Sequence, residues 1–289
     1  MFHRLLPPGN RAPVRTLGTL DVLDPVAKTL GKLARDATKP KRLKEVISGS
    51  WLGHPLHPVL TDVTIGTLTS ALLLDWLGGR ASRPAAQRLI GLGLISAAPV
   101  VVSGASDWAD TEVADESVRR IGLVHATTNL VAATLFAASY TARRRGDNGR
   151  VLALAGGAAL TAGGYLGGHL SFAEGVGVDH TAFEEAPDDW TDVLAESDLL
   201  GEQPRCVEAD GTAVMVVRRN GTLYALSNQC SHRGGPLHEG EITDTTVTCP
   251  WHTSVFDLRD GALIHGPAAY PQPAWDVRVR SGRIAVRRR

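Results

Sequence analysis

Apolar positions in the first half of the chain occur in long, uninterrupted runs. Residues 89–106, 121–142 and 151–173 carry no charged side chain, and residues 58–77 form a weaker run with two aspartates near its ends. A helix of about 20 apolar residues crosses roughly 30 Å of hydrocarbon. A soluble core helix of this length would show a polar face, which these runs lack. The pattern therefore predicts four transmembrane helices.

In the second half of the chain, apolar and polar positions follow a different, shorter period. From about residue 191, short runs such as "AVMVVRR" and "AWDVRVR" alternate apolar and polar positions, and turn dipeptides such as Asp210-Gly211 and Asn220-Gly221 separate them. Short alternating runs between turns are typical of a β-sandwich or barrel. The predicted fold is an all-α four-helix transmembrane bundle followed by an all-β domain of short antiparallel strands.

These patterns divide the chain into four regions. Residues 1–50 are a polar segment in which 21–37 could form an interfacial amphipathic helix or a solvated, structureless stretch. Residues 51–173 form the four-helix domain, residues 174–190 an acidic linker, and residues 191–289 the β domain. Lysine plus arginine is 30 and aspartate plus glutamate is 30, so charge predicts no nucleic-acid partner, and we expect a lipid bilayer instead.

Two cysteine–histidine pairs lie in the β domain, within "CSHRGGPLHEGEITDTTVTCPWH". Cys230 and His232 form C-x-H, and Cys249 and His252 form C-x-x-H. Zinc or a [2Fe–2S] cluster accepts two thiolates and two imidazoles. Zinc fingers place both cysteines before both histidines, whereas each stretch here offers one of each. Two crossing loops can then give both sulfurs to one iron and both nitrogens to the other, which favours the cluster.

The stretches "CSHRGGPL", "CPWHTSVFDL" and "GPAAYPQPAW" resemble the two ligand boxes and the proline loop of the Rieske family. The resemblance covers residues 191–289. It implies that Cys230 and Cys249 bind one iron of a [2Fe–2S] cluster and that His232 and His252 bind the other.

The boxes depart from the quinol-oxidising branch of that family. Its two additional cysteines are missing, and Trp251 stands where the second would be, so the domain is similar to the ferredoxin type. Ser254 keeps a serine that donates a hydrogen bond to a cluster sulfur, while Phe256 lacks the hydroxyl of the family's tyrosine. The resemblance therefore implies a reduction potential below that of the quinol-oxidising branch.

Four further histidines fall on one side of the predicted bundle: His54, His57, His125 and His169. Ionisable side chains at membrane depth are costly and are usually functional. These residues could ligate haem b, line a quinone pocket, bind a metal, or simply be hydrogen-bonded by a neighbouring helix. The four glycines within residues 163–168 predict either a close helix crossing around a flat cofactor or ordinary small-residue packing.

The first half also resembles a known family. "WLGHPLHPVLTDVTIG" and "GGHLSFAEGVGVDHTAFE" are similar to a four-helix membrane family of unknown function that is often fused to a Rieske domain. Basic residues are nearly balanced between the two sides of the bundle, so the positive-inside rule does not choose an orientation. Residues 1–50 show no cleavable signal peptide, and the cluster loops have no disulfide. We therefore expect a cell-membrane protein with a cytoplasmic Rieske domain.

The predicted function is that of a membrane-anchored electron-transfer protein, which could pass electrons between the cluster and a haem or quinone site in the helices. We expect an electron carrier or oxidoreductase component rather than a stand-alone enzyme. Two alternatives remain open. The helices could tether a ferredoxin-like module that serves a separate oxygenase or reductase, or the cluster could act as a redox sensor. In each case the redox partner, a protein or a quinone, is unidentified.

Overall fold

The computed structural model describes residues 12–289, so residues 1–11 of the polar N-terminal segment lie outside it. The chain forms two compact units. The helical unit comprises the described residues up to Pro40 together with Leu56–Val176. The β unit comprises Lys41–Pro55 together with Gly177–Arg289. Residues 41–55 therefore belong to the β unit, although they precede the first long helix in the sequence.

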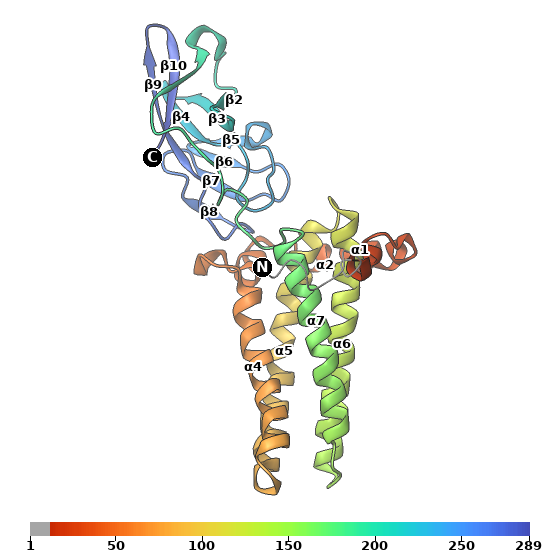
Figure 1. Ribbon diagram of the computed structural model, residues 1–289. Coiled ribbons are helices and arrows are strands. Elements are labelled where there is room, and N and C mark those ends of the chain that lie inside the picture. Colours follow the sequence, from red (N-terminus) through yellow and green to blue (C-terminus); the bar gives the residue numbers. More distant parts are fainter. Residues whose placement is uncertain (1–11) are drawn as a thin grey trace, which may run out of the picture. The chain divides into compact units, whose positions relative to one another are not determined.

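Four long helices run side by side in the helical unit (Figure 1). Each is long and apolar enough to cross a membrane, and together they cover the four predicted runs. Leu68, Ile90 and Phe136 lie in their shared core. The Asp115 carboxylate caps the third helix by accepting the backbone N–H of Ser117 at 2.8 Å. The helices are α4 (Leu56–Leu77), α5 (Arg83–Thr111), α6 (Glu116–Arg144) and α7 (Arg150–Phe172).

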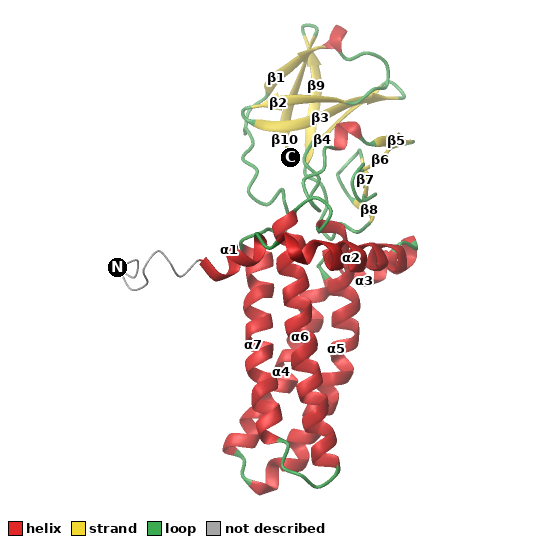
Figure 2. Cartoon of the chain, turned by 90° about the vertical axis from the view of Figure 1, so that its right-hand side faces the viewer, coloured by secondary structure: helices red, strands yellow, loops and turns green. Residues whose placement is uncertain are grey.

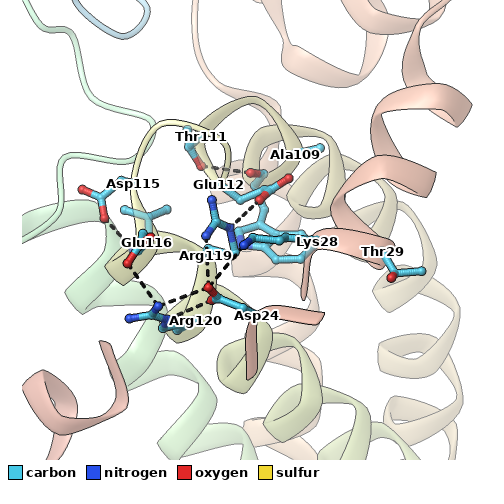
Figure 3. A network of polar contacts seen from close by, with 12 residues as sticks. Asp24, Lys28, Thr29, Ala109, Thr111, Glu112, Asp115, Glu116, Arg119 and Arg120 are labelled. Atoms are coloured by element: carbon cyan, nitrogen blue, oxygen red, sulfur yellow. Dashed lines mark hydrogen bonds and ion pairs between the residues drawn. The ribbon is translucent and has the colours of Figure 1, made fainter. Parts of the chain in front are cut away.

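Two shorter helices, α1 (Ala12–Gly18) and α2 (Asp24–Thr38), lie across one end of this bundle (Figure 2). An ion-pair network joins α2 to the turn between α5 and α6 (Figure 3). Arg120 Nε lies 2.9 Å from Asp24 Oδ1, and Arg119 Nε lies 2.8 Å from Glu112 Oε2. Glu112 and both arginines are buried. The side of α2 that faces the bundle therefore carries Asp24 together with the small, buried residues Ala27 and Gly31.

Two antiparallel sheets form the β unit. One has the strand order β1-β10-β9-β4-β3-β2, and the other has the order β5-β6-β7-β8. The strands are β1 (Thr191–Ala195), β2 (Arg205–Ala209), β3 (Thr212–Arg219), β4 (Thr222–Ser227), β5 (Glu241–Thr243), β6 (Thr246–Thr248), β7 (Val255–Asp257), β8 (Leu263–His265), β9 (Ala274–Arg280) and β10 (Arg283–Arg288). The predicted fold class is confirmed for both halves of the chain.

The inner faces of the two sheets contribute to one hydrophobic cluster. It contains Met215 and Leu226 from the larger sheet and Val247 and Phe256 from the smaller one. Cys230 and Cys249 belong to the same cluster and are almost completely buried. The loops that carry the two cysteines are therefore anchored on a packed core.

Helix α3 (Lys41–Ser48) and the 3-10 turn Ser50–Leu52 complete the β unit. Glu45 is hydrogen-bonded to His265 on β8. Ser50 Oγ donates to the carbonyl oxygen of Ala268 at 2.8 Å, across 218 positions in the sequence. This N-terminal segment therefore packs on the loop that follows β8.

Candidate metal centre

The two loops with the predicted ligands are closed by their own backbone hydrogen bonds. In the first, the Cys230 N–H donates to the Gly235 carbonyl at 2.9 Å, and the Gly234 N–H donates to the Cys230 carbonyl at 2.8 Å. In the second, the Cys249 N–H donates to the Ser254 carbonyl at 2.8 Å. Tight closure directs the cysteine and histidine of each loop to the same side.

The four side chains form two pairs of like chemistry. The sulfurs of Cys230 and Cys249 are hydrogen-bonded to each other. The rings of His232 and His252 meet edge to face, with their centroids 4.9 Å apart. Among residues 12–289, no three histidine, cysteine or acidic side chains surround one point as a single metal ion would need. Paired sulfurs and paired imidazoles suit a two-iron cluster better than tetrahedral zinc.

Backbone amides surround both sulfurs. Each sulfur accepts two N–H groups from its own loop, which stabilise negative charge on it. The donors are His232 and Arg233 for Cys230, and Trp251 and His252 for Cys249. The hydrogen bond from Cys230 lowers the pKa of Cys249 to about 7, and the partner sulfur together with burial raises the pKa of Cys230. The amide donors and the partner thiol therefore both favour negative charge on the Cys249 sulfur.

The His232 imidazole is favoured in its neutral, ligating form. Burial lowers the pKa of His232 well below its usual value, and the nearby His252, Lys44 and Arg233 lower it further. A neutral imidazole has a free lone pair for a metal. Both rings are only partly covered, whereas both sulfurs are buried.

Gly235 keeps the first loop close to the sulfurs. A Cβ at this position would lie 2.9 Å from the Cys249 sulfur and 3.1 Å from the Trp251 ring. The preceding Gly234 has a φ of +74°, a conformation that glycine adopts at low cost. Because there is no side chain at 235, the loop can wrap the site closely, and these residues fit a compact inorganic group.

Ser254 and Phe256 are both buried beside the second loop. The Ser254 oxygen accepts the Ala268 N–H at 2.9 Å. Its own hydroxyl hydrogen therefore remains available to another acceptor. The hydrogen bond from Ser254 to a cluster sulfur stays a prediction, and Phe256 has no hydroxyl to add a second one.

The four histidines of the first half are divided between the two units. His54 belongs to the β unit, and the other three belong to the helical unit. Each has its own hydrogen-bonding neighbour. These neighbours are the Pro55 carbonyl for His54 (2.9 Å), the Val100 carbonyl for His57 (3.1 Å), the Gly163 carbonyl for His125 (2.9 Å) and the Glu174 carboxylate for His169 (3.3 Å).

Glycines make room for two of these rings. A Cβ at Gly104 would lie 2.6 Å from Cε1 of His57, and a Cβ at Gly167 would lie 2.9 Å from Cε1 of His125. At Gly163 it would lie 2.5 Å from the Asn129 amide. Gly163 and Gly167 of α7 thus lie against polar side chains of α6, which is typical of small-residue packing, whereas a Cβ at Gly164 would meet nothing within 4 Å.

Residues 189–277 match the family described as Rieske [2Fe-2S] domain, and residues 53–180 match the family described as predicted membrane protein (DUF2231). Apoptosis-inducing factor 3 of Mus musculus is 32% identical over 90 residues, which are 31% of this chain but only 15% of that protein. The anthranilate 1,2-dioxygenase ferredoxin subunit of Burkholderia cepacia is 29% identical over 98 residues, 34% of this chain and 91% of that protein.

Among solved structures, the ferredoxin of carbazole 1,9a-dioxygenase from Nocardioides aromaticivorans IC177 is 34% identical and has a TM-score of 0.33. The match covers 35% of this chain and 98% of the ferredoxin. The family matches confirm both resemblances seen in the sequence. Residues 189–277 are a Rieske domain, which implies a [2Fe–2S] cluster, and they follow a domain of the DUF2231 membrane-protein family at residues 53–180.

Proposed function

We propose that the protein is a membrane-anchored one-electron carrier, in which Cys230, Cys249, His232 and His252 hold a [2Fe–2S] cluster. The observation that carries this proposal is the pairing of the ligands, with two buried sulfurs together and two imidazoles 4.9 Å apart. When bound, such a cluster supplies one-electron redox chemistry. The residues of this chain bind it, stabilise charge on its sulfur ligands and set its exposure.

An exposed aromatic side chain lies beside the histidines of the site. The Trp251 side chain is 51% exposed, and its ring meets that of His252 edge to face at 6.4 Å. Because the sulfurs are buried, we expect a redox partner to dock against the imidazoles. The similarity to a dioxygenase ferredoxin subunit favours an oxygenase or reductase as that partner.

Membrane anchoring is supported by the surface of the helical unit. One exposed stripe of α2 is apolar: Val26, Leu30 and Leu33 are 56%, 44% and 60% exposed, and Val22 just before the helix is 74% exposed. Asp24 and Arg35 of the same helix reach the ion pairs of α5 and α6. A helix that exposes its apolar side suits the boundary between headgroups and acyl chains. The cytoplasmic placement of the Rieske domain stays a prediction of the sequence.

A second candidate function is electron exchange with haem b or a quinone in the helices. It is favoured by one observation. His57 and His125 each place Nδ1 against a backbone carbonyl, so Nδ1 carries the proton and Nε2 keeps its lone pair, as metal-ligating histidines do. The glycine gaps that these rings fill count against it, as does the Asn129 amide beside His125. We therefore place the tethered ferredoxin first.

The test is an optical and electron paramagnetic resonance study of the detergent-purified protein, oxidised and dithionite-reduced, with a pyridine haemochrome assay. We expect Rieske bands and no haem from cells supplied with haem. Cys249→Ala should lose the bands, whereas Cys206→Ala should keep them, since Cys206 is an exposed thiol on β2. A wild-type protein without cluster signals would refute the proposal, and a haem absorption would promote the second candidate.

A further inference from the structure

A hydrogen-bond relay connects residue 50 to the second ligand loop. Ser50 Oγ donates to the Ala268 carbonyl at 2.8 Å, and the N–H of Ala268 donates to Ser254 Oγ at 2.9 Å. Ala268 is fully buried and Ser254 is 1% exposed, so water does not compete for these groups. The carbonyl of Ser254 in turn accepts the N–H of the cysteine ligand Cys249.

The direction of the relay restricts the Ser254 hydroxyl. Because its oxygen accepts the Ala268 N–H, its hydrogen must point away from that amide. The N–H and the C=O of Ala268 belong to the two peptide groups that share its Cα, so a movement of this residue would turn or free the Ser254 hydroxyl. Ser50 is the side chain that holds the carbonyl of residue 268, and it comes from the segment before the first membrane helix.

The same segment fits the loop closely at neighbouring positions. A Cβ at Gly266 would lie 1.8 Å from Ser50 Oγ and 2.9 Å from Ser50 Cβ, so position 266 has no room for a side chain while Ser50 stays in place. Glu45 is hydrogen-bonded to His265, one residue earlier. Ser48 Oγ lies 2.9 Å from Ser50 Oγ and supports it from within the segment.

We propose that Ser50 is a positioning residue for the cluster: through Ala268 it orients the Ser254 hydroxyl and thereby sets the reduction potential. This rests on the proposed function, in which Cys249 is a ligand. A hydrogen bond to sulfur stabilises the additional negative charge of the reduced state. The N-terminal segment thus controls the redox property of a domain that lies two hundred residues later in the chain.

The test is a double-mutant cycle read as reduction potential, by titration monitored with electron paramagnetic resonance. Ser254→Ala should lower the potential, and Ser50→Ala should lower it by a smaller amount. The combined variant should equal Ser254→Ala alone, because Ser50 acts through that hydroxyl. Ser50→Thr, which keeps a hydroxyl, should stay near wild type. Ser197→Ala, an exposed serine of the same unit, is the matched control and should not shift.

A second readout does not depend on the cluster. Hydrogen exchange of the Ala268 amide should be faster in Ser50→Ala and unchanged in Ser197→Ala. Gly266→Ala should displace Ser50 sterically and lower the potential as Ser50→Ala does, which keeps the test available if one variant folds poorly.

The outcomes separate the two proposals. A wild-type protein without a cluster would refute the proposed function. A cluster-loaded Ser50→Ala protein with wild-type potential would refute the relay alone. Additive shifts of Ser50→Ala and Ser254→Ala would also refute it, because they would mean that Ser50 acts by another route.

Discussion

The two units bury polar side chains in different ways. In the helical unit, polar side chains pair with a partner on a neighbouring segment: Glu112 pairs with Arg119, and His125 bonds to the Gly163 carbonyl. In the β unit, two short loops bring His232 and His252 together, and the same loops bring the sulfurs of Cys230 and Cys249 together. A histidine is therefore a convincing ligand where other donors converge on it, and its presence at membrane depth is weaker evidence.

The largest expected difference is between removing a histidine of the ligand loops and removing a histidine of the helical unit. His252→Ala should abolish the Rieske optical and magnetic signals, because one iron loses half of its protein ligands. His125→Ala should leave those signals and the potential unchanged, and should cost about 0.5–1.5 kcal/mol of stability through the lost hydrogen bond to the Gly163 carbonyl. Loss of cluster signals in His125→Ala would contradict the distinction between the units.

The next largest effect is a loss of stability when the ion-pair network in Figure 3 is broken. The Glu112 side chain is only 2% exposed and bonds to Arg35 and Arg119, so Glu112→Ala removes the nearer counter-charge of the buried Arg119 and leaves it Asp24 at 3.6 Å. We expect a loss of about 3–5 kcal/mol, measured by thermal unfolding in detergent. The matched control is Glu116→Ala, whose carboxylate pairs with Arg120 but is 67% exposed. It should cost about 1 kcal/mol or less. Equal losses in the two variants would argue against a role for burial.

A substitution at Gly167 of α7 should have a smaller effect on stability. Gly167→Ala places a methyl group against the His125 ring and should cost about 1–3 kcal/mol through overpacking. In a His125→Ala background the same change should cost much less, since the ring is gone. Thermal unfolding of the four proteins measures the coupling. If Gly167→Ala lowered the stability of the His125→Ala protein as much as that of the wild type, the missing side chain at 167 would not be what accommodates the His125 ring.

The smallest effect is a pH dependence of the helical unit. The hydrogen bond from Arg120 and the neighbouring cations hold the pKa of Asp24 at about 2, below its ordinary value. A depressed pKa contributes stability that is complete above about pH 4 and is lost as pH falls toward 2. Melting temperature against pH should therefore fall less steeply in Asp24→Asn over this range. Identical acid profiles would show that the pair does not contribute.

The sequence by itself determined the parts of this protein that depend on local pattern. Four apolar runs predicted α4 to α7, because membrane length and hydropathy are properties of contiguous residues. The alternation after residue 191 predicted the β domain for the same reason. The two cysteine–histidine pairs indicated a cluster because their spacing places donors of both kinds on each of two short loops.

Tertiary structure alone decided which distant residues meet. Ser50 and Glu45 carry no motif, yet they contact Ala268 and His265 in the β unit. Similarly, nothing local to His125 reveals that a carbonyl and a glycine gap on α7 receive its ring. Such contacts join segments far apart in the chain, and packing selects them through shape and hydrogen-bond complementarity rather than through periodicity or spacing.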